Sequence, residues 1–168
     1  MSPDVLIRHA TASDAALIAA IYNEGIAERQ ATFETRPRDA EEVAGWLGGR
    51  LPVLVAERGG EVLGFARVSP YSERAVYAGV GEQGVYVAPS ARGSGLASAL
   101  LAELASAAEA AGLYKLTARI FTTNEPSIAA HRAAGFEVVG IQRRHGRLDG
   151  EWRDCVLMER LLGEAASP

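Results

Sequence analysis

A turn rich in glycine follows a stretch of strand-forming residues near the middle of the chain. Residues 85–87, Val-Tyr-Val, favour a β-strand, and Pro89 cannot continue a sheet ladder. Small residues from Gly93 onward lead into a helical pattern. The amide hydrogens of a helix's first turn lack internal partners and carry partial positive charge, and glycines let a ligand approach the backbone. This turn therefore favours binding of an anion such as a pyrophosphate.

Three kinds of phosphate-binding loop compete for this stretch. A P-loop needs Lys-Ser or Lys-Thr after its last glycine, but Leu96-Ala97 follows Gly95. A dinucleotide-binding fingerprint needs an acid at the end of the next strand, and residues 116–120 carry none. The third pattern, Arg-x-x-Gly-x-Ala, is present at residues 92–97. A glycine-rich turn that binds no ligand remains an alternative on this hexapeptide alone.

Composition excludes several classes of protein. With 168 residues the chain is the size of one domain, expected over 1–168 with its core at about 5–162. A formal net charge of −4 without a basic stripe argues against a nucleic-acid partner. No apolar run approaches the ~20 residues of a membrane span, and no signal pattern opens the chain, so we expect a cytoplasmic protein. The single Cys155 cannot form an internal disulfide or a multi-cysteine metal site, and no metal is expected.

Hydrophobic periodicity predicts the elements that must position the turn. We expect strands at 5–8, 52–57, 62–68, around 85–87, 113–121, 136–143 and 152–161. We expect helices from the cap at 11–14 to Gly25, from Asp39 to 48–49, at 94–111 and at 124–135. Strands that alternate with helices, opened by a helical pair and closed by a hairpin, indicate an α/β fold with a mixed sheet.

Two separate motifs resemble those of one enzyme family. Residues 92–97 resemble the acetyl-CoA loop of the GNAT superfamily of N-acetyltransferases, and residues 124–136, an Asn, a helix and Gly-Phe, resemble its second CoA motif. The order of elements also resembles the GNAT fold, which implies a mixed, mostly antiparallel seven-stranded sheet flanked by about four helices. Segments 22–24, 32–33, 74–77, 82–89 and 150–154 are similar to the branch that includes phosphinothricin, methionine sulfoximine and arsinothricin N-acetyltransferases.

The resemblance assigns roles to individual residues. It implies that Glu82 is the general base of a direct acetyl transfer, although a lone glutamate on a strand is more often a solvated carboxylate. His131 stands where many relatives have a tyrosine, and it would protonate the departing thiolate unless it is a half-buried histidine bonded to backbone. Arg74 would hold the acid group of the substrate, with a surface arginine paired to Glu73 as the alternative.

The remaining site residues follow from the same comparison. Acetyl-CoA contacts are implied at Val85, Tyr86, Val87, Arg92, Gly93, Ser94, Gly95, Leu96, Ala97, Ser98, Asn124 and Ser127. Helix capping is the competing role of Asn124. Substrate contacts are implied at Phe33, Arg74, Ala75 and Tyr77, where Phe33 is either a core plug or a pocket wall.

The function implied is transfer of the acetyl group of acetyl-CoA to the α-amino group of a small amino-acid-like substrate. Phosphinothricin, methionine sulfoximine or sulfone, and arsinothricin are the substrate types of this branch, and resistance to such herbicides or antibiotics would follow. The branch also implies a cytoplasmic homodimer. Two alternatives remain open: acetylation of a polyamine or a peptide N-terminus, and a non-catalytic acyl-CoA sensor of the same fold.

Overall fold

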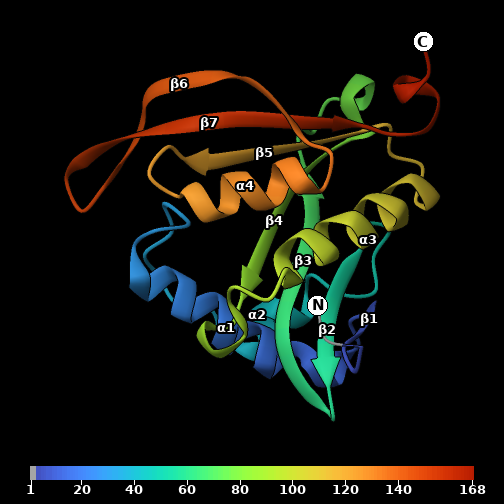
Figure 1. The fold of residues 1–168 in the computed structure, drawn as a ribbon, viewed down its shortest axis with the longest axis vertical. Helices are drawn as coiled ribbons and strands as arrows, with labels where there is room; N and C mark the ends of the chain where they lie inside the picture. Colours follow the sequence, from blue (N-terminus) through green and yellow to red (C-terminus); the bar gives the residue numbers. More distant parts are fainter. Residues whose placement is uncertain (1–2) are drawn as a thin grey trace.

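In the computed structural model, which describes residues 3–168, seven strands form one sheet in the order β1-β2-β3-β4-β5-β7-β6 (Figure 1). Neighbouring strands are antiparallel except β4 and β5. The strands are β1 (Leu6–His9), β2 (Val53–Arg58), β3 (Glu61–Pro70), β4 (Val80–Val87), β5 (Lys115–Phe121), β6 (Glu137–Leu148) and β7 (Glu151–Leu161). The α-helices are α1 (Ala15–Glu28), α2 (Ala40–Ala44), α3 (Leu96–Ala110) and α4 (Glu125–Ala133). The predicted fold class and order of elements are confirmed.

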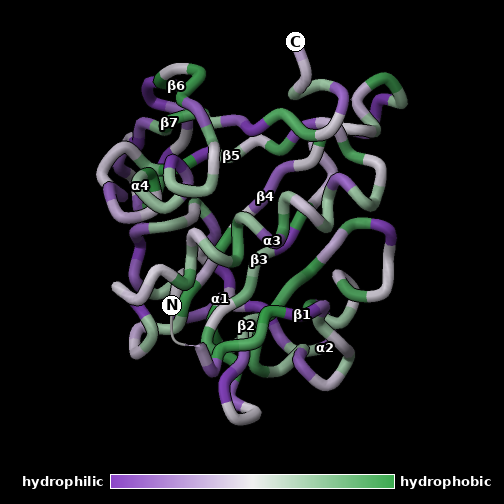
Figure 2. The backbone as a smooth tube through the Cα atoms, turned by 45° about the vertical axis from the view of Figure 1, so that its right-hand side comes forward, coloured by the Kyte–Doolittle hydropathy of each residue, from purple (hydrophilic) through white to green (hydrophobic). Residues whose placement is uncertain are grey.

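Helices cover both faces of the sheet because successive strand side chains point to opposite faces. On one face α3 buries Leu100, Leu101 and Leu104 in a hydrophobic cluster that also contains residues of β2, β3, β5 and β7. On the other face α1 and α2 bury Ile18 and Val43 against β2 and β3. Figure 2 shows the hydrophobic run along β2, which contributes to both clusters.

The first helix is longer than the sequence predicted. We expected it to end near Gly25, but α1 continues to Glu28 and ends where Arg29 adopts a left-handed φ of 59°. Gly25 is buried inside the helix, and a Cβ atom there would lie 2.9 Å from the ring of Tyr86. This glycine therefore serves the close packing of α1 on β4 rather than the end of the helix.

Other element boundaries also differ from those that the sequence predicted. α2 ends at Ala44, before the expected stop at the glycine pair 48–49. β4 begins at Val80, several residues before the strand expected around 85–87, and β6 runs to Leu148 rather than 143. Both strands are extended by pairing with neighbours: β4 pairs with β3 from Gly81 and with β5 from Val80, and β6 pairs with β7 across two irregularities in register. Pairing partners, which local sequence does not reveal, set these limits.

Candidate active site

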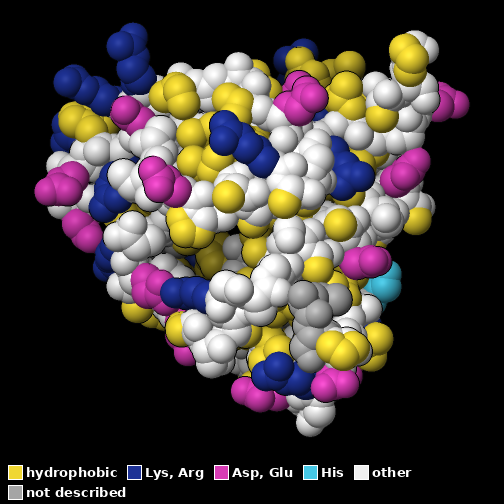
Figure 3. Space-filling model, viewed as in Figure 1, with side chains coloured by type: hydrophobic (Ala, Val, Ile, Leu, Met, Phe, Trp, Pro, Cys, Tyr) yellow, Lys and Arg dark blue, Asp and Glu magenta, His cyan; other side chains and the backbone are white. Residues whose placement is uncertain are grey.

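The parallel strands β4 and β5 separate partway along their length. Residues 80–82 of β4 pair with residues 115–117 of β5, whereas β3 pairs with β4 as far as Val87. From Gln83 onward, no described strand pairs with the edge of β4 that faces β5. Figure 1 shows the two strands diverging with α4 over the split, and Figure 3 shows a hollow on this face of the molecule. The split leaves backbone donors and acceptors free beside the hollow.

The glycine-rich turn begins at the end of β4 and leads into α3. Gly93 and Gly95 have φ values of 76° and 80°, in the left-handed region that favours glycine. Among the hydrogen bonds of residues 3–168, none uses a backbone N–H of residues 93–98 as its donor. Six successive backbone amides at the positive end of a 15-residue helix thus lack a hydrogen-bond acceptor within the described residues. The geometry fits a pyrophosphate, because phosphate oxygens accept such bonds.

Side chains of the turn hold it in place. The Oγ atoms of Ser94 and Ser98 donate to the carbonyls of Ala91 and Gly95, at 2.6 and 3.0 Å. Arg92 donates two 2.8 Å hydrogen bonds to the carboxylate of Glu28, at the end of α1, and this ion pair lowers the pKa of Glu28. The structure therefore places Arg92 as a link between the turn and α1, and its contact with acetyl-CoA stays a prediction.

Glu82 lies at the apex of the split, in the last residue pair that joins β4 to β5. Its Oε1 atom is 3.1 Å from Nη1 of Arg119, and about a third of each side chain is exposed (34% and 36%). Alternation along β4 places Glu82, Gly84 and Tyr86 on the sheet face that α1 and α2 cover. A carboxylate that solvent can reach, held by one arginine, has an oxygen available to accept a proton.

His131 lies on the opposite face and is buried (2% exposed). Its Nδ1 atom is 2.7 Å from the carbonyl oxygen of Ser127, and its Nε2 atom is 2.5 Å from Nε2 of Gln83. A neutral ring satisfies both contacts if Nδ1–H donates to the carbonyl and Nε2 accepts from the amide. Burial lowers the pKa of His131, which also favours the neutral ring. The geometry matches the structural alternative, a histidine bonded to backbone.

Asn124 joins the start of α4 to the segment after α1. Its side-chain oxygen accepts from the N–H of Ser127 at 3.4 Å, so the predicted helix cap forms. Its Nδ2 atom donates to the carbonyl of Gln30 at 3.2 Å. The side chain thus has structural partners on both sides, while the CoA contacts of Asn124 and Ser127 remain predictions.

The segment between α1 and α2 crosses from one half of the sheet to the other. Asn23 fixes its far end through two 2.8 Å hydrogen bonds with the backbone of Arg38. Phe33 packs edge-on against Phe121 of β5, with ring centroids 4.8 Å apart, and joins the small cluster of Leu148 and Cys155. The structure confirms the packing role considered for Phe33, and its role as a pocket wall stays a prediction.

The other predicted substrate residues lie in an exposed segment. Ala75 and Tyr77 bound a short 3₁₀ helix between β3 and β4, and Arg74 precedes it. The guanidinium of Arg74 lies 5.4 Å from the centre of the Tyr77 ring. No ion pair joins Arg74 to Glu73 or to another acid in the described part of the chain. Within residues 3–168, no hydrogen bond or ion pair joins the 74–77 segment to Glu82, so these residues are not brought together by such contacts.

The sequence analysis assigned no site role to two arginines on the sheet face that α1 and α2 cover. Arg119 of β5 pairs with Glu82, and Arg67 of β3 lies opposite Gly84 of β4. A signal was present at Arg67, because it shares one face of its strand with Phe65 and Ser69, and the other residues of that strand are mostly apolar. A charged residue at such a position needs a structural or functional partner.

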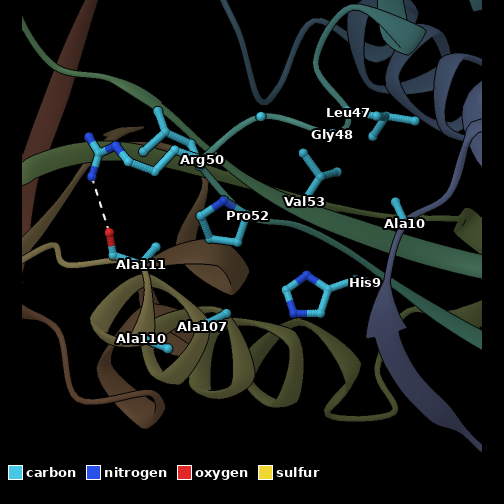
Figure 4. Close-up of a pocket in the computed structure, with 12 residues that line it drawn as sticks. His9, Ala10, Leu47, Gly48, Arg50, Pro52, Val53, Ala107, Ala110 and Ala111 are labelled. Carbon is cyan, nitrogen blue, oxygen red and sulfur yellow. Dashed lines mark hydrogen bonds between the residues drawn. The ribbon is translucent and has the colours of Figure 1, made fainter.

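A cavity of about 390 Å³ lies elsewhere, beside the C-terminal end of α3 (Figure 4). His9, Leu47, Arg50 and Ala111 are among its lining residues, and Arg50 donates to the carbonyl of Ala111 at 3.2 Å. The 15 residues of α3, at a rise of ~1.5 Å per residue, separate this cavity from the glycine-rich turn by about 20 Å. None of the predicted site residues lines it.

The described residues, 3–168, form neither a metal site nor a membrane-spanning helix. No group of three or more His, Cys, Asp or Glu side chains is arranged to hold a metal ion there. Among the helices of the same residues, none combines the length and apolar character that crossing a membrane requires.

Comparison with known proteins identifies the relatives of this architecture. Residues 18–136 match the model of the acetyltransferase (GNAT) family. The chain is 36% identical to a phosphinothricin N-acetyltransferase of Streptomyces coelicolor, over 95% of this chain and 97% of that protein. It is 35% identical to an L-methionine sulfoximine/L-methionine sulfone acetyltransferase of Pseudomonas paraeruginosa, over 96% of each. A putative acetyltransferase of Salmonella typhimurium, solved with its cofactor acetyl-CoA, superposes with a TM-score of 0.91 at 32% identity over 98% of both chains.

Proposed function

The chain belongs to the GNAT family of acetyltransferases, and from this premise we propose that it acetylates the α-amino group of a small amino acid of the phosphinothricin or methionine sulfoximine type. The acyl donor is acetyl-CoA. The observation that carries the proposal is the arrangement at the split: a turn of free amides at one end and the carboxylate of Glu82 at the apex. The names of two relatives that cover nearly the whole chain support the substrate class.

The residues around the split suit acetyl-CoA. Its pyrophosphate would accept hydrogen bonds from the amides of residues 93–98, where two left-handed glycines keep side chains away. The free edge of β4, including Val85 and Val87, offers backbone groups to the amide-containing arm. When bound, acetyl-CoA supplies an acetyl group activated as a thioester.

Glu82 is proposed to remove a proton from the incoming amine. An α-amino group titrates about one unit above neutrality, so most of it is protonated at pH 7 and cannot attack a carbonyl. The Glu82 carboxylate accepts that proton directly or through one water molecule, while Arg119 holds the carboxylate in position. Its place at the apex, one strand residue before the free edge of β4 begins, supports this role.

His131 is proposed to position Gln83 and the edge of β4. Both ring nitrogens already have partners, Ser127 and Gln83, and burial holds the ring neutral. Donation of a proton to the leaving thiolate would require the contact with Gln83 to break. The side-chain oxygen Oε1 of Gln83 is buried without a hydrogen-bond partner. It is therefore available to accept a hydrogen bond from a donor that enters the split.

Substrate selection gives the direct test. Release of CoA thiol from acetyl-CoA should be faster with phosphinothricin, methionine sulfoximine or methionine sulfone than with their decarboxylated amines, because an arginine such as Arg74 pairs with the acid group. Arg74→Lys should lose much of this preference, since an ammonium lacks the planar fork. Equal rates with amines or peptides would instead indicate a polyamine or peptide acetyltransferase. Binding of acetyl-CoA without turnover on any amine would support the alternative of a non-catalytic acyl-CoA sensor.

We also propose a homodimer formed through β6 and β7. β6 is a long edge strand, and this hairpin exposes Val138 (43%), Val139 (53%), Ile141 (54%) and Trp152 (49%). Ile141→Glu should convert the dimer to monomer in sedimentation or light scattering, because a charge would be desolvated at the interface. Leu17→Glu, at an exposed position of α1, is the matched control and should remain dimeric. A monomeric wild-type protein at all concentrations refutes the proposal.

A further inference from the structure

Arg67 is a partly buried arginine that has no acidic partner. Its Nε atom is buried without a hydrogen bond, and no ion pair of residues 3–168 includes it. Its guanidinium lies 3.9 Å from the centre of the Trp46 ring, which leaves one face of the cation stacked and desolvated. Burial lowers the pKa of Arg67, and its neighbours Tyr22 and Tyr86 are neutral phenols, because burial raises the pKa of both.

Strand register places Arg67 on the same sheet face as the proposed general base, opposite a residue two positions along β4 from it. Arg67 pairs across the strands with Gly84, which lies between Glu82 and Tyr86 on the same face of the sheet. Gly84 has no side chain, and a Cβ atom there would meet only the ring of Tyr86, at an ordinary contact distance of 3.4 Å. Apart from its chain neighbours, the Tyr86 ring is thus the only group within 4 Å of the position that a Gly84 side chain would take, among the described residues.

The nearby acids do not compensate this charge. Glu82 pairs with Arg119 at 3.1 Å, and Glu34, which lies near Tyr22, pairs with Arg38 at 2.9 Å. Arg67 is only partly buried, and of its three nitrogens Nε alone is buried without a partner, so an anion from outside would gain charge-assisted hydrogen bonds with the guanidinium. The arrangement therefore favours an acidic ligand at this guanidinium.

We propose that Arg67 binds an acidic group of the acceptor substrate, a carboxylate or phosphinate, in the space over Gly84. This inference rests on the proposed function and adds a specificity-determining residue on β3, separate from Arg74 in the connection that follows. Binding there holds the substrate next to Glu82, so that the amine approaches the base while the acid group neutralises the buried cation.

The test replaces Arg67 by methionine, which keeps much of the stack on Trp46 and removes the charge. The kcat/KM for phosphinothricin should fall by ~10- to 100-fold, the value of one charged hydrogen-bond pair. The melting temperature should stay the same or rise, because an unpaired buried charge is removed. Arg132→Met removes an exposed arginine of α4 and is the matched control. A lower melting temperature with unchanged kcat/KM would show a purely structural role and overturn the proposal.

A second substrate identifies which acidic group is bound. Methionine sulfone keeps the α-carboxylate but has a neutral side chain. Equal losses on both substrates in Arg67→Met assign the α-carboxylate, and a loss confined to phosphinothricin assigns the side-chain phosphinate; either supports the proposal. Gly84→Val should reproduce the loss with Arg67 intact, because its side chain fills the space opposite the guanidinium. Unchanged kinetics in both variants would refute the site.

Binding measurements separate this inference from the proposed function. Phosphinothricin, added in the presence of CoA, should raise the melting temperature of the wild-type protein but not of Arg67→Met. If the wild-type protein binds the acid and releases no thiol from acetyl-CoA, the acetyltransferase proposal fails while the Arg67 site stands. Binding of equal strength in wild type and Arg67→Met, or no binding to either, overturns the site.

Discussion

Glutamine in place of Glu82 is expected to lower kcat by ~10²- to 10⁴-fold, the usual contribution of general-base catalysis. The amide keeps the size of the side chain but cannot accept the proton of the amine at neutral pH. Acetyl-CoA affinity should remain unchanged, because the amides of residues 93–98 lie at the other end of the free edge. Stability should change little, since the ion pair with Arg119 is about one-third exposed.

Rates of thiol release at saturating acetyl-CoA, measured from pH 6 to 9, check this expectation. Glu103→Gln, at an exposed position of α3, is the matched control and should keep the wild-type rate. Part of the lost rate should return at high pH in Glu82→Gln, because the amine then loses its proton to solvent. Full activity of Glu82→Gln near neutral pH would remove this carboxylate from the mechanism.

Valine in place of Gly95 is expected to weaken acetyl-CoA binding by ~10- to 100-fold or more, because each charged hydrogen bond lost at the turn is worth about 1.5–3 kcal/mol. Gly95 has a φ of 80°, which a β-branched residue adopts only with strain, so the turn must change shape or lose stability. A valine side chain would also stand between the backbone and the pyrophosphate.

Gly112 supplies a matched control for that strain. It follows the opposite end of α3 with a φ of 91°, and a Cβ atom there would meet nothing within 4 Å. Gly112→Val should lose stability, at a cost of about 1–2 kcal/mol, and keep its affinity for acetyl-CoA in calorimetry. Wild-type affinity in a folded Gly95→Val protein would mean that the turn does not hold the pyrophosphate.

Local sequence predicted the parts of this protein that depend on neighbouring residues. The turn at residues 93–98 could be recognised because its glycines, its small residues and the helix after it are consecutive in the chain. The number and order of strands and helices followed from hydrophobic periodicity and turn residues, and the family followed from two motifs. Gly25 misled the same reasoning, since a glycine that ends a helix and one that admits a packed ring look alike in sequence.

The tertiary structure decided which side chains meet across the sheet. Glu82 with Arg119, Gln83 with His131, and Arg67 with Trp46 are pairs separated by 20 or more residues in the sequence. Their contacts depend on strand register, on the point where β4 leaves β5, and on which face each helix covers. A shift of one residue in register would send every side chain of a strand to the opposite face. The sequence therefore determined the glycine-rich turn and the fold class, and only strand pairing placed an arginine without an acidic partner on the same sheet face as the proposed base.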